Sequence, residues 1–349
     1  MTTIGIVGAG AAGLATAYGL RTAPVDVTVF EKSRGFGGRA ATRGRDGHRY
    51  DHGATFFSSP TERVHRLVTR HLSSEGLVDI GSLAIWGFER DGTLVQHEPD
   101  EKASPRWTYR AGVSTLGKLL ARQSKVAVRR NTRITGLAHQ EKGWSVQTAD
   151  GAVEKMYDAL VLTPPAPQTA TLLETAFMQS DSEAVNAVWQ AVRDVRYASQ
   201  FAYIFAYNHQ LDRPDNLCGL RGVDDQHPLA WIGFENAKPG HVREGHSVVI
   251  VHTSPSWTAE RVDARPSSFV ADVQTWMNDL LDADLQDPAW VDTQRWRYSR
   301  PKGQVASAGR AAGREVGLFL AGDAVAGRGG VGAALENGLA TADRLRKWG

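Results

Sequence analysis

The opening of the chain reads as a strand, a glycine-rich turn, a helix and a second strand. The apolar run Ile4–Val7 leads into Gly8-x-Gly10-x-x-Gly13, and small residues follow at helical spacing. A second apolar run, Val25–Phe30, stops at Glu31. A glycine-rich turn alone is a weak signal, but this order of elements predicts a βαβ unit that binds a dinucleotide.

Each residue of the turn has a physical task in such a unit. Gly8 permits the tight turn, Gly10 lets the backbone approach a pyrophosphate, and Gly13 lets the helix pack closely on the strands. The phosphates then lie against free N–H groups at the start of the helix, where Ala11 and Ala12 stand. The turn is therefore the predicted phosphate site.

Glu31 lies about 20 residues beyond the glycines, where a carboxylate accepts hydrogen bonds from the hydroxyls of an adenosine ribose. A 2′-phosphate would be repelled by this carboxylate. The sequence therefore favours FAD or NAD over NADP as the ligand of this site.

Composition narrows the function classes. The 349 residues carry a formal charge of only +2, and the arginines are dispersed, so a basic nucleic-acid footprint is absent from the sequence. Cys218 is the single cysteine, which excludes an internal disulfide and a paired-cysteine zinc or redox site. No apolar run reaches about 20 residues, and the first strand begins too early for a signal peptide, so we expect a cytoplasmic protein without membrane contact.

Two further segments are built for close approach to a cofactor. The loop that begins with Lys32 contains Gly38, whose backbone can approach a ligand, and Arg39, whose guanidinium can donate to a phosphate or a ribose. In Asp51-His52-Gly53-Ala54-Thr55, small residues interrupt an aromatic stretch. This pattern indicates backbone that lies close to a flat ring system.

These motifs, in this order, resemble the FAD-dependent amine oxidase superfamily, and the chain is similar to its bacterial renalase-like branch. Four later segments carry that resemblance: Val161–Gln168, Val251–Trp257, Arg295–Pro301 and Leu318–Ala324. The resemblance implies a Rossmann-type FAD-binding domain interleaved with a mixed α+β substrate domain, as in amine oxidases and p-hydroxybenzoate hydroxylase. With Cys218 as the only thiol, we expect FAD to be bound without a covalent link.

The resemblance also adds cofactor-binding residues outside the first βαβ unit. Asp323, after Gly322 at the end of a predicted strand, can accept from the ribityl chain, and the next helix can stabilise negative charge on a reduced flavin. The chain departs from the family here, because Gly330–Ala334 lacks the usual Arg-Val-Glu pattern. The full cofactor set comprises Gly8, Gly10, Ala11, Ala12, Gly13, Glu31, Lys32, Gly38, Arg39, Gly53, Ala54, Thr55, Ile134, Thr163, Gly322, Asp323, Val331, Gly332 and Ala333.

We expect an FAD-binding domain made of residues 1–57, 106–167 and 292–349, and a substrate domain made of 58–105 and 168–291. Residues 126–128, 144–148 and 159–162 are predicted strands of a small β-meander in the FAD-binding domain. Within the substrate domain we predict a helical region at 172–195, strands at 201–207, 230–234 and 247–252, and a helix at 267–281.

The composition of the predicted substrate pocket favours a reaction that needs no general base. Lys238 and Lys302 stand in Lys-Pro-Gly and Pro-Lys-Gly sequences, which predict exposed turns. Without these lysines, the predicted pocket contains aromatic rings, which can stack on a nicotinamide, and an imidazole, which can orient its carboxamide. The candidate catalytic residues are His252, Trp257, Trp296 and Tyr298. Phe56, Phe57 and Trp231 are further aromatic candidates for the lining of the pocket. The histidine spacings predict no metal site.

The resemblance implies oxidation of the 2- or 6-dihydro isomers of NAD(P) to NAD(P)⁺, with O₂ reduced to H₂O₂. Two alternatives remain open at this point. One is an amine oxidase or desaturase that acts on an apolar substrate, and the other is a flavin- or NAD-binding regulator without turnover. The sequence leaves the oligomeric state open.

Overall fold

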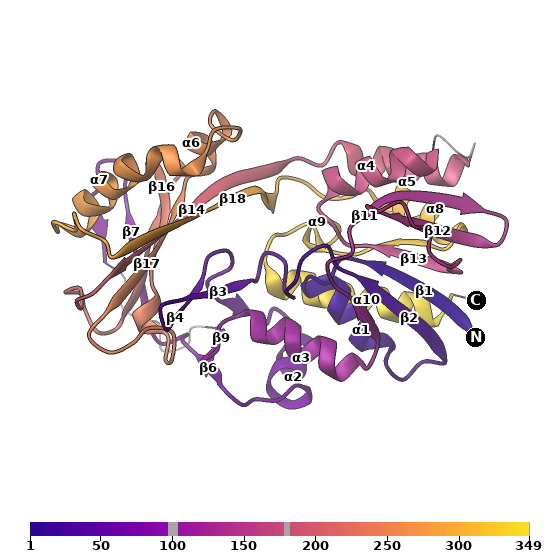
Figure 1. Ribbon diagram of the computed structural model, residues 1–349, viewed down its shortest axis with the longest axis horizontal. Helices are drawn as coiled ribbons and strands as arrows, with labels where there is room; N and C mark the ends of the chain where they lie inside the picture. Colours follow the sequence, from indigo (N-terminus) through magenta and orange to yellow (C-terminus); the bar gives the residue numbers. More distant parts are fainter. Residues whose placement is uncertain (97–103, 178–181, 349) are drawn as a thin grey trace.

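The computed structural model describes residues 1–96, 104–177 and 182–348. A five-stranded parallel sheet lies at one end of the molecule, beside both chain termini (Figure 1). Its strands, in spatial order, are β10 (Ala127–Arg129), β2 (Val25–Phe30), β1 (Thr2–Val7), β13 (Ala159–Leu162) and β19 (Leu318–Leu320). The predicted βαβ unit is confirmed, with Ile6 of β1 opposite Val29 of β2.

Both faces of this sheet are covered, because β1 alternates its apolar side chains between two cores. Ile4 and Ile6 face one core, and Val7 faces the other. The first core is closed by α1 (Ala11–Leu20), α2 (Glu62–Arg66), η1 (Leu67–His71), α3 (Ser114–Ser124) and α10 (Val331–Arg346). The second contains side chains of α4 (Ala166–Phe177), α5 (Glu183–Arg193), α9 (Asp323–Ala326) and the hairpin of β11 (Ile134–Gln140) and β12 (Gly143–Thr148). Helix α8 (Ser307–Glu315) packs on α5 through Gly309.

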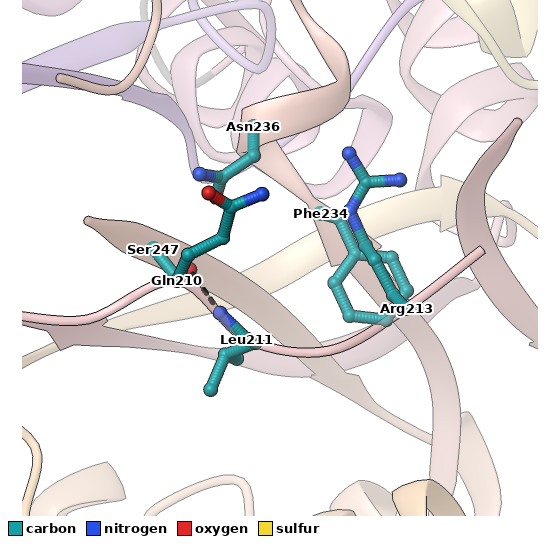
Figure 2. A pocket seen from close by; sticks show the side chains of 6 residues that line it. All are labelled: Gln210, Leu211, Arg213, Phe234, Asn236 and Ser247. Atoms are coloured by element: carbon teal, nitrogen blue, oxygen red, sulfur yellow. Dashed lines mark hydrogen bonds between the residues drawn. The ribbon is translucent and has the colours of Figure 1, made fainter. Parts of the chain in front are cut away.

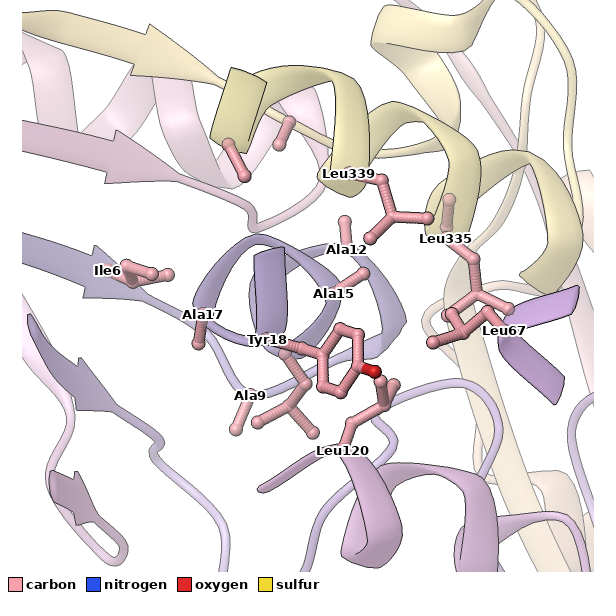
Figure 3. Packing of buried hydrophobic residues seen from close by; sticks show 14 of the residues in the cluster. Ile6, Ala9, Ala12, Ala15, Ala17, Tyr18, Leu67, Leu120, Leu335 and Leu339 are labelled. Atoms are coloured by element: carbon pink, nitrogen blue, oxygen red, sulfur yellow. The ribbon is translucent and has the colours of Figure 1, made fainter. Parts of the chain in front are cut away.

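The close packing of α1 on α10 follows from small residues. A Cβ atom on Gly338 would lie 2.3 Å from the Ala12 carbonyl oxygen, and one on Gly19 would lie 2.5 Å from the Ala342 Cβ. Figure 3 shows alanines of α1 beside leucines of α10 in this core. The Thr16 hydroxyl donates to the Gly338 carbonyl at 3.1 Å. Because the two helices run side by side in the same direction, their N-termini reach the same edge of the sheet.

A seven-stranded mixed sheet forms the other end of the molecule (Figure 1). Its spatial order is β18 (Trp290–Pro301), β14 (Tyr197–Tyr207), β17 (Ser247–Thr253), β16 (Leu229–Phe234), β15 (Leu217–Gly222), β7 (Ala84–Phe88) and β8 (Leu94–Val95). One face packs on α7 (Val270–Leu281), with η3 (Pro266–Phe269) and α6 (Pro255–Ala259) beside it. The opposite face packs on the hairpin of β3 (Thr42–Arg45) and β4 (His48–Asp51).

The remaining described elements join the two ends. A three-stranded sheet contains β5 (Phe57–Ser58), β9 (Arg106–Tyr109) and β6 (Leu77–Asp79). A short turn of 3₁₀ helix, η2 (Glu235–Ala237), follows β16. The boundary that we place at residue 292 falls inside β18, a strand of the seven-stranded sheet.

Most predicted elements of the central region are confirmed. The predicted strands are β14, β16 and β17, and the helix at 267–281 is η3 followed by α7. The predicted helical region at 172–195 is α4 and α5. Residues 178–181 between them lie outside the described part of the chain, and so do residues 97–103 of the predicted substrate domain and residue 349 of the predicted FAD-binding domain.

The predicted β-meander is wrong for two of its three strands. β10 and β13 are members of the parallel sheet, and only β12 belongs to a separate hairpin, paired with β11. The reason lies in burial: all four residues of β13 are buried, as expected for a strand covered on both faces.

Candidate active site

Three glycines of the first turn have three different environments. Gly8 has a φ of +104°, which only glycine adopts without strain, and a Cβ on Gly13 would lie 2.0 Å from the Gly8 carbonyl oxygen. A Cβ on Gly10 would meet no atom within 4 Å. Gly8 and Gly13 are thus required by the fold itself, and Gly10 borders open space at the carboxyl edge of the parallel sheet.

Glu31 is fixed at the same edge by the turn. Its carboxylate accepts the Ala9 N–H at 2.7 Å and the Ser33 N–H at 2.8 Å, and the residue is buried. Each carboxylate oxygen keeps a further lone pair for another donor. The neighbouring Lys32 is exposed, so only the glutamate is held in place here.

The other strands end beside this turn. The Thr163 hydroxyl, just after β13, donates to the Val7 carbonyl at 2.8 Å. Ile134 of β11 is buried in the same core as Val7 and Phe30. The predicted residues Thr163 and Ile134 therefore lie in the packing that shapes this edge.

Asp323 is held by Arg39 across the edge. The guanidinium donates to both carboxylate oxygens, at 2.7 and 2.8 Å, and also to the Ser299 carbonyl at 3.0 Å. The Ala54 N–H in turn donates to the Arg39 carbonyl at 2.9 Å. Arg39 thereby ties together three predicted segments: the glycine-rich loop, the Gly-Asp turn and β18.

The turn before α10 contains two kinds of glycine. Gly330 has a φ of +116°, and a Cβ there would meet no atom within 4 Å. A Cβ on Gly332 would lie 2.2 Å from the Ser58 carbonyl oxygen, so packing against β5 accounts for that glycine. The N–H groups of the first turn, at Val331 and Ala333, belong to a helix end whose dipole is positive.

Strand register places a second set of predicted residues on one face of the seven-stranded sheet. His252 of β17 lies opposite Trp231 of β16 on one side and opposite Ala202 of β14 on the other. Trp296 of β18 lies opposite Gln200 of the same β14. Since paired residues share a face, Trp231, His252 and Trp296 all point toward the β3–β4 hairpin.

His52, which follows β4 of the facing hairpin, forms hydrogen bonds to both His252 and Trp296. Its carbonyl oxygen accepts the Trp296 indole N–H at 2.9 Å and the His252 Nε2–H at 3.2 Å. The His52 and Trp296 rings stack with centroids 5.3 Å apart. His52 is not among the predicted site residues, although its place directly after Asp51 in the small-residue motif was the available signal.

Both histidines are neutral at physiological pH. Burial lowers the pKa of His252 to about 4 and that of His52 to about 3. Two buried polar atoms near this face, His52 Nδ1 and Trp231 Nε1, have no hydrogen-bond partner among the described residues. The face therefore combines aromatic surface with uncharged donors and acceptors.

Trp257 and Tyr298 lie apart from this group. Trp257 packs edge-on against Phe269 and Trp276, in the core between the sheet and α7. Helix α6 begins directly after β17 and turns Trp257 to the far face, so we remove it from the candidate site. Tyr298 packs edge-on against Tyr197, whose ring is 5.9 Å from the Arg39 guanidinium, and so lies toward the Gly-Asp turn.

Of the two neighbouring residues Phe56 and Phe57, only Phe56 lies beside the sheet face. The Phe56 ring lies 6.1 Å from the Trp231 ring, beside the sheet face. Phe57 is buried in the core of the parallel sheet. Neighbouring residues of an extended segment point in opposite directions, and only the first of the pair reaches the candidate site.

The predicted exposure of Lys238 is wrong, whereas Lys302 is exposed as predicted. Lys238 is only 5% exposed, and its ammonium donates to Glu235 at 2.6 Å and to Asp51 at 3.1 Å. Burial lowers the pKa of Lys238, but the two carboxylates outweigh it and raise the pKa above its ordinary value. The lysine is therefore a held ammonium and cannot act as a base.

His241 completes this buried quartet of Asp51, Glu235, Lys238 and His241. Its Nδ1 donates to Glu235 at 2.7 Å and its Nε2 to the Tyr109 carbonyl at 2.9 Å, so both ring nitrogens carry protons. Burial lowers the pKa of His241, but Glu235 raises it by more. The two cations thus face the carboxyl groups of Glu235, whose pKa they lower despite its burial, and of Asp51, whose pKa burial raises.

The same quartet contains the one cluster of metal-ligand type found in the described residues. Ligand atoms of Asp51, Glu235 and His241 lie within 4.8 Å of one another. The Lys238 ammonium already bonds both carboxylates, so it takes the place that a cation would have. The absence of a metal stays a prediction.

A small hollow lies at the other end of the sheet (Figure 2). It is lined by Gln210, Leu211, Arg213, Phe234, Asn236 and Ser247. Ser247 stands five residues before His252 on β17, which is about 17 Å along a strand. The Ser247 hydroxyl accepts the Leu211 N–H, and Arg213 donates to three backbone carbonyls. The hollow is separate from the candidate site.

Two family models match the chain. Residues 6–71 match the model of an NAD(P)-binding Rossmann-like domain, and residues 81–346 match the model of flavin containing amine oxidoreductases. The second match spans most of the chain. The chain belongs to the flavin-containing amine oxidoreductase family. This confirms the superfamily that the sequence motifs resemble.

Solved structures share the fold of this flavin amine oxidoreductase across its full length. A proposed protoporphyrinogen oxidase from Exiguobacterium sp. 255-15 is 16% identical, with a TM-score of 0.79 and 99% of each chain covered. Putrescine oxidase bound to putrescine is 14% identical, with a TM-score of 0.71, 99% of this chain and 98% of that chain covered. Reduced UDP-galactopyranose mutase is 12% identical, with a TM-score of 0.77 and coverage of 100% and 96%.

As a member of this family, the protein is an FAD-dependent oxidoreductase acting on a small molecule. The carboxyl edge of the parallel sheet fits FAD, since Gly10 and Gly330 leave open space beside two helix N-termini. The space lies beside β1, where the sheet order changes direction, as expected for a dinucleotide site. Among the described helices, none has the length and apolarity to cross a membrane.

Proposed function

We propose that the protein oxidises the 2- or 6-dihydro isomers of NAD(P) to NAD(P)⁺, with O₂ reduced to H₂O₂. The proposal rests mainly on one observation. The sheet face at Trp231, His252 and Trp296 is aromatic, and both His252 and the adjacent His52 are neutral. A flat, uncharged ring with a carboxamide matches such a face.

The residues at the sheet edge have proposed roles toward FAD. The Gly8–Gly13 turn and the first N–H groups of α1, at Ala11 and Ala12, would hold the pyrophosphate, and Glu31 the adenosine ribose. The α10 N-terminus would stabilise negative charge on the reduced ring system. Bound FAD supplies a two-electron acceptor for a hydride, and O₂ restores it by taking those electrons with two protons to give H₂O₂.

Within the described part of the chain, neither Lys238 nor His252 is an effective base, which supports a dihydropyridine substrate. When a dihydropyridine gives up hydride, it becomes an aromatic pyridinium, and no proton has to leave a heteroatom. An amine or alcohol donor must lose a proton, but Lys238 is held as an ammonium, and burial lowers the pKa of His252 to about 4, which makes its free Nδ1 a weak base. Stacking on the aromatic face and a hydrogen bond to the carboxamide would suffice to orient the ring.

His252 is the proposed orienting residue, since its unprotonated Nδ1 can accept from a carboxamide N–H. Trp296 is the proposed stacking partner, held in place by its bond to His52. The division into an FAD-binding domain and a substrate domain, with the boundaries given above, is part of this proposal.

Steady-state oxygen consumption by the purified yellow protein tests the overall reaction. With 6-dihydro-NAD(P) we expect one O₂ consumed and one H₂O₂ formed for each NAD(P)⁺ produced. Ordinary 4-dihydro NADH at the same concentration is the control, with a much lower rate expected. Turnover of putrescine or another amine, with none of the dihydro isomers, would replace this proposal with amine oxidation.

A further inference from the structure

Two arginines lie at the rim of the substrate face. Arg221 of β15 is paired with Trp231, so it shares the face that carries His252, and its guanidinium is 5.8 Å from the Trp231 ring. Arg300, near the end of β18, packs its Cβ and Cγ within 4 Å of where a Gly329 Cβ would lie. Arg300 thus stands between the substrate face and the turn before α10.

Neither guanidinium has a carboxylate partner within the described ranges, although many other arginines do. Arg39, Arg43, Arg63 and Arg297 each form an ion pair with an aspartate. Arg106 lies nearby and donates to the Gly81 and Leu83 carbonyls instead. The positive charge at this rim is therefore not balanced by the protein.

The arginines also act on one another. Arg221 is exposed as a residue, but partial burial of its side chain lowers its pKa, and the positive charges of Arg300 and Arg106 lower it further. The charge of Arg300 also reaches His252 and contributes to lowering its pKa. Like charges gathered without a counter-charge cost free energy, and a bound anion would recover it.

We propose that Arg221 and Arg300 form a subsite for the phosphate groups of the substrate. A guanidinium fork matches phosphate oxygens in a two-bond geometry, and the Trp231 ring beneath Arg221 helps to hold that fork. The subsite rests on the proposed function in so far as the diphosphate belongs to a dihydronicotinamide dinucleotide. It disfavours a cationic amine, which the same charges would repel.

Calorimetric titration of the FAD-loaded protein with inorganic pyrophosphate tests the subsite without turnover. Wild type should bind, and Arg221→Gln and Arg300→Gln should each weaken binding by roughly tenfold or more, as for loss of one charge-assisted hydrogen bond. Arg297→Gln is the matched control on the same strand, because Arg297 turns away to Asp263, and it should bind as wild type. Acetate in place of pyrophosphate separates a phosphate subsite from a carboxylate subsite.

Unchanged pyrophosphate binding in both variants, or none in wild type, would overturn the subsite, and so would equal affinity for acetate. A kinetic arm then assigns the phosphate to the substrate. For 6-dihydro-NAD, the half-saturating concentration for flavin reduction should rise roughly tenfold in each variant, whereas the dihydronicotinamide riboside, which lacks phosphates, should be unaffected. If no dihydro isomer reduces the flavin, the proposed function fails, while the titration still decides the subsite.

Discussion

Gly10 and Gly13 stand three residues apart in one turn but serve different ends. Gly13 is enclosed, since a Cβ there would lie 2.0 Å from the Gly8 carbonyl oxygen. Gly10 is extended, with a φ of −77°, and faces open space. The motif alone predicts glycine at both positions, but only the structure separates the glycine that the fold requires from the one that the ligand requires.

This separation predicts opposite effects of two substitutions. Gly10→Val should change the free energy of unfolding of the apoprotein by no more than about 1 kcal/mol, yet abolish FAD binding, since its side chain fills the phosphate space. Gly13→Ala should destabilise the apoprotein by about 1 to 3 kcal/mol through overpacking. Denaturant unfolding and the flavin absorbance of each purified variant measure the two effects. Full FAD occupancy in Gly10→Val would contradict the proposed phosphate site.

The two neutral histidines predict the pH dependence of flavin reduction. Their pKa values, about 4 for His252 and about 3 for His52, lie below the ordinary value, so both are already deprotonated above pH 5.5. The limiting rate of flavin reduction should be constant from pH 5.5 to 9, as measured by anaerobic stopped flow at each pH. A rate that rises with a midpoint between pH 6 and 8 would show that a titrating base takes part.

At the scale of elements, the buried quartet joins parts of the chain that are distant in sequence. Asp51 ends β4, Glu235 begins η2, Lys238 follows η2, and His241 bonds the backbone of β9 at Tyr109. A local sequence pattern cannot reveal this arrangement, because Asp51 and Lys238 are 187 positions apart. The Lys-Pro-Gly sequence does form a turn, but long-range pairing buries its lysine.

Removal of the central cation should therefore weaken the contact that η2, after β16 of the seven-stranded sheet, makes with β4 and β9. Lys238→Met leaves two carboxylates buried with one fewer counter-charge, which should cost about 3 to 5 kcal/mol in the free energy of unfolding. Lys302→Met is the matched control, because the same change at an exposed turn should alter it by no more than about 0.5 kcal/mol. Denaturant unfolding compares the two variants, and equal stability would show that the quartet contributes little.

Local sequence patterns predict the positions of strands and helices, but not which face of a sheet each side chain reaches. The βαβ unit and strands β14, β16 and β17 follow from local apolar patterns, and the structure confirms them. The face on which a residue lies depends on how the chain leaves a strand. Trp257 illustrates this, because Ser254 caps α6 directly after β17 and the helix carries the ring into the core beside α7.

At the scale of the whole molecule, the chain crosses repeatedly between the two sheets. Both β14 and β18 extend from the seven-stranded sheet toward the parallel sheet (Figure 1), and Arg39 bonds Ser299 of β18 and Asp323 beyond β19. The cofactor edge and the aromatic face are thereby fixed relative to each other. The sequence motifs indicated each part separately, whereas their union depends on contacts between residues more than 200 positions apart.

In the proposed function, the aromatic, uncharged face presents a dihydropyridine to FAD. Anaerobic stopped-flow absorbance tests it directly, with the purified yellow protein mixed separately with 2-dihydro, 6-dihydro and 4-dihydro NAD. Rapid loss of the oxidised flavin band with the 2- or 6-dihydro isomers, and slow loss with the 4-dihydro form, is the predicted result. Rapid loss with the 4-dihydro form and no response to the other isomers would contradict the account.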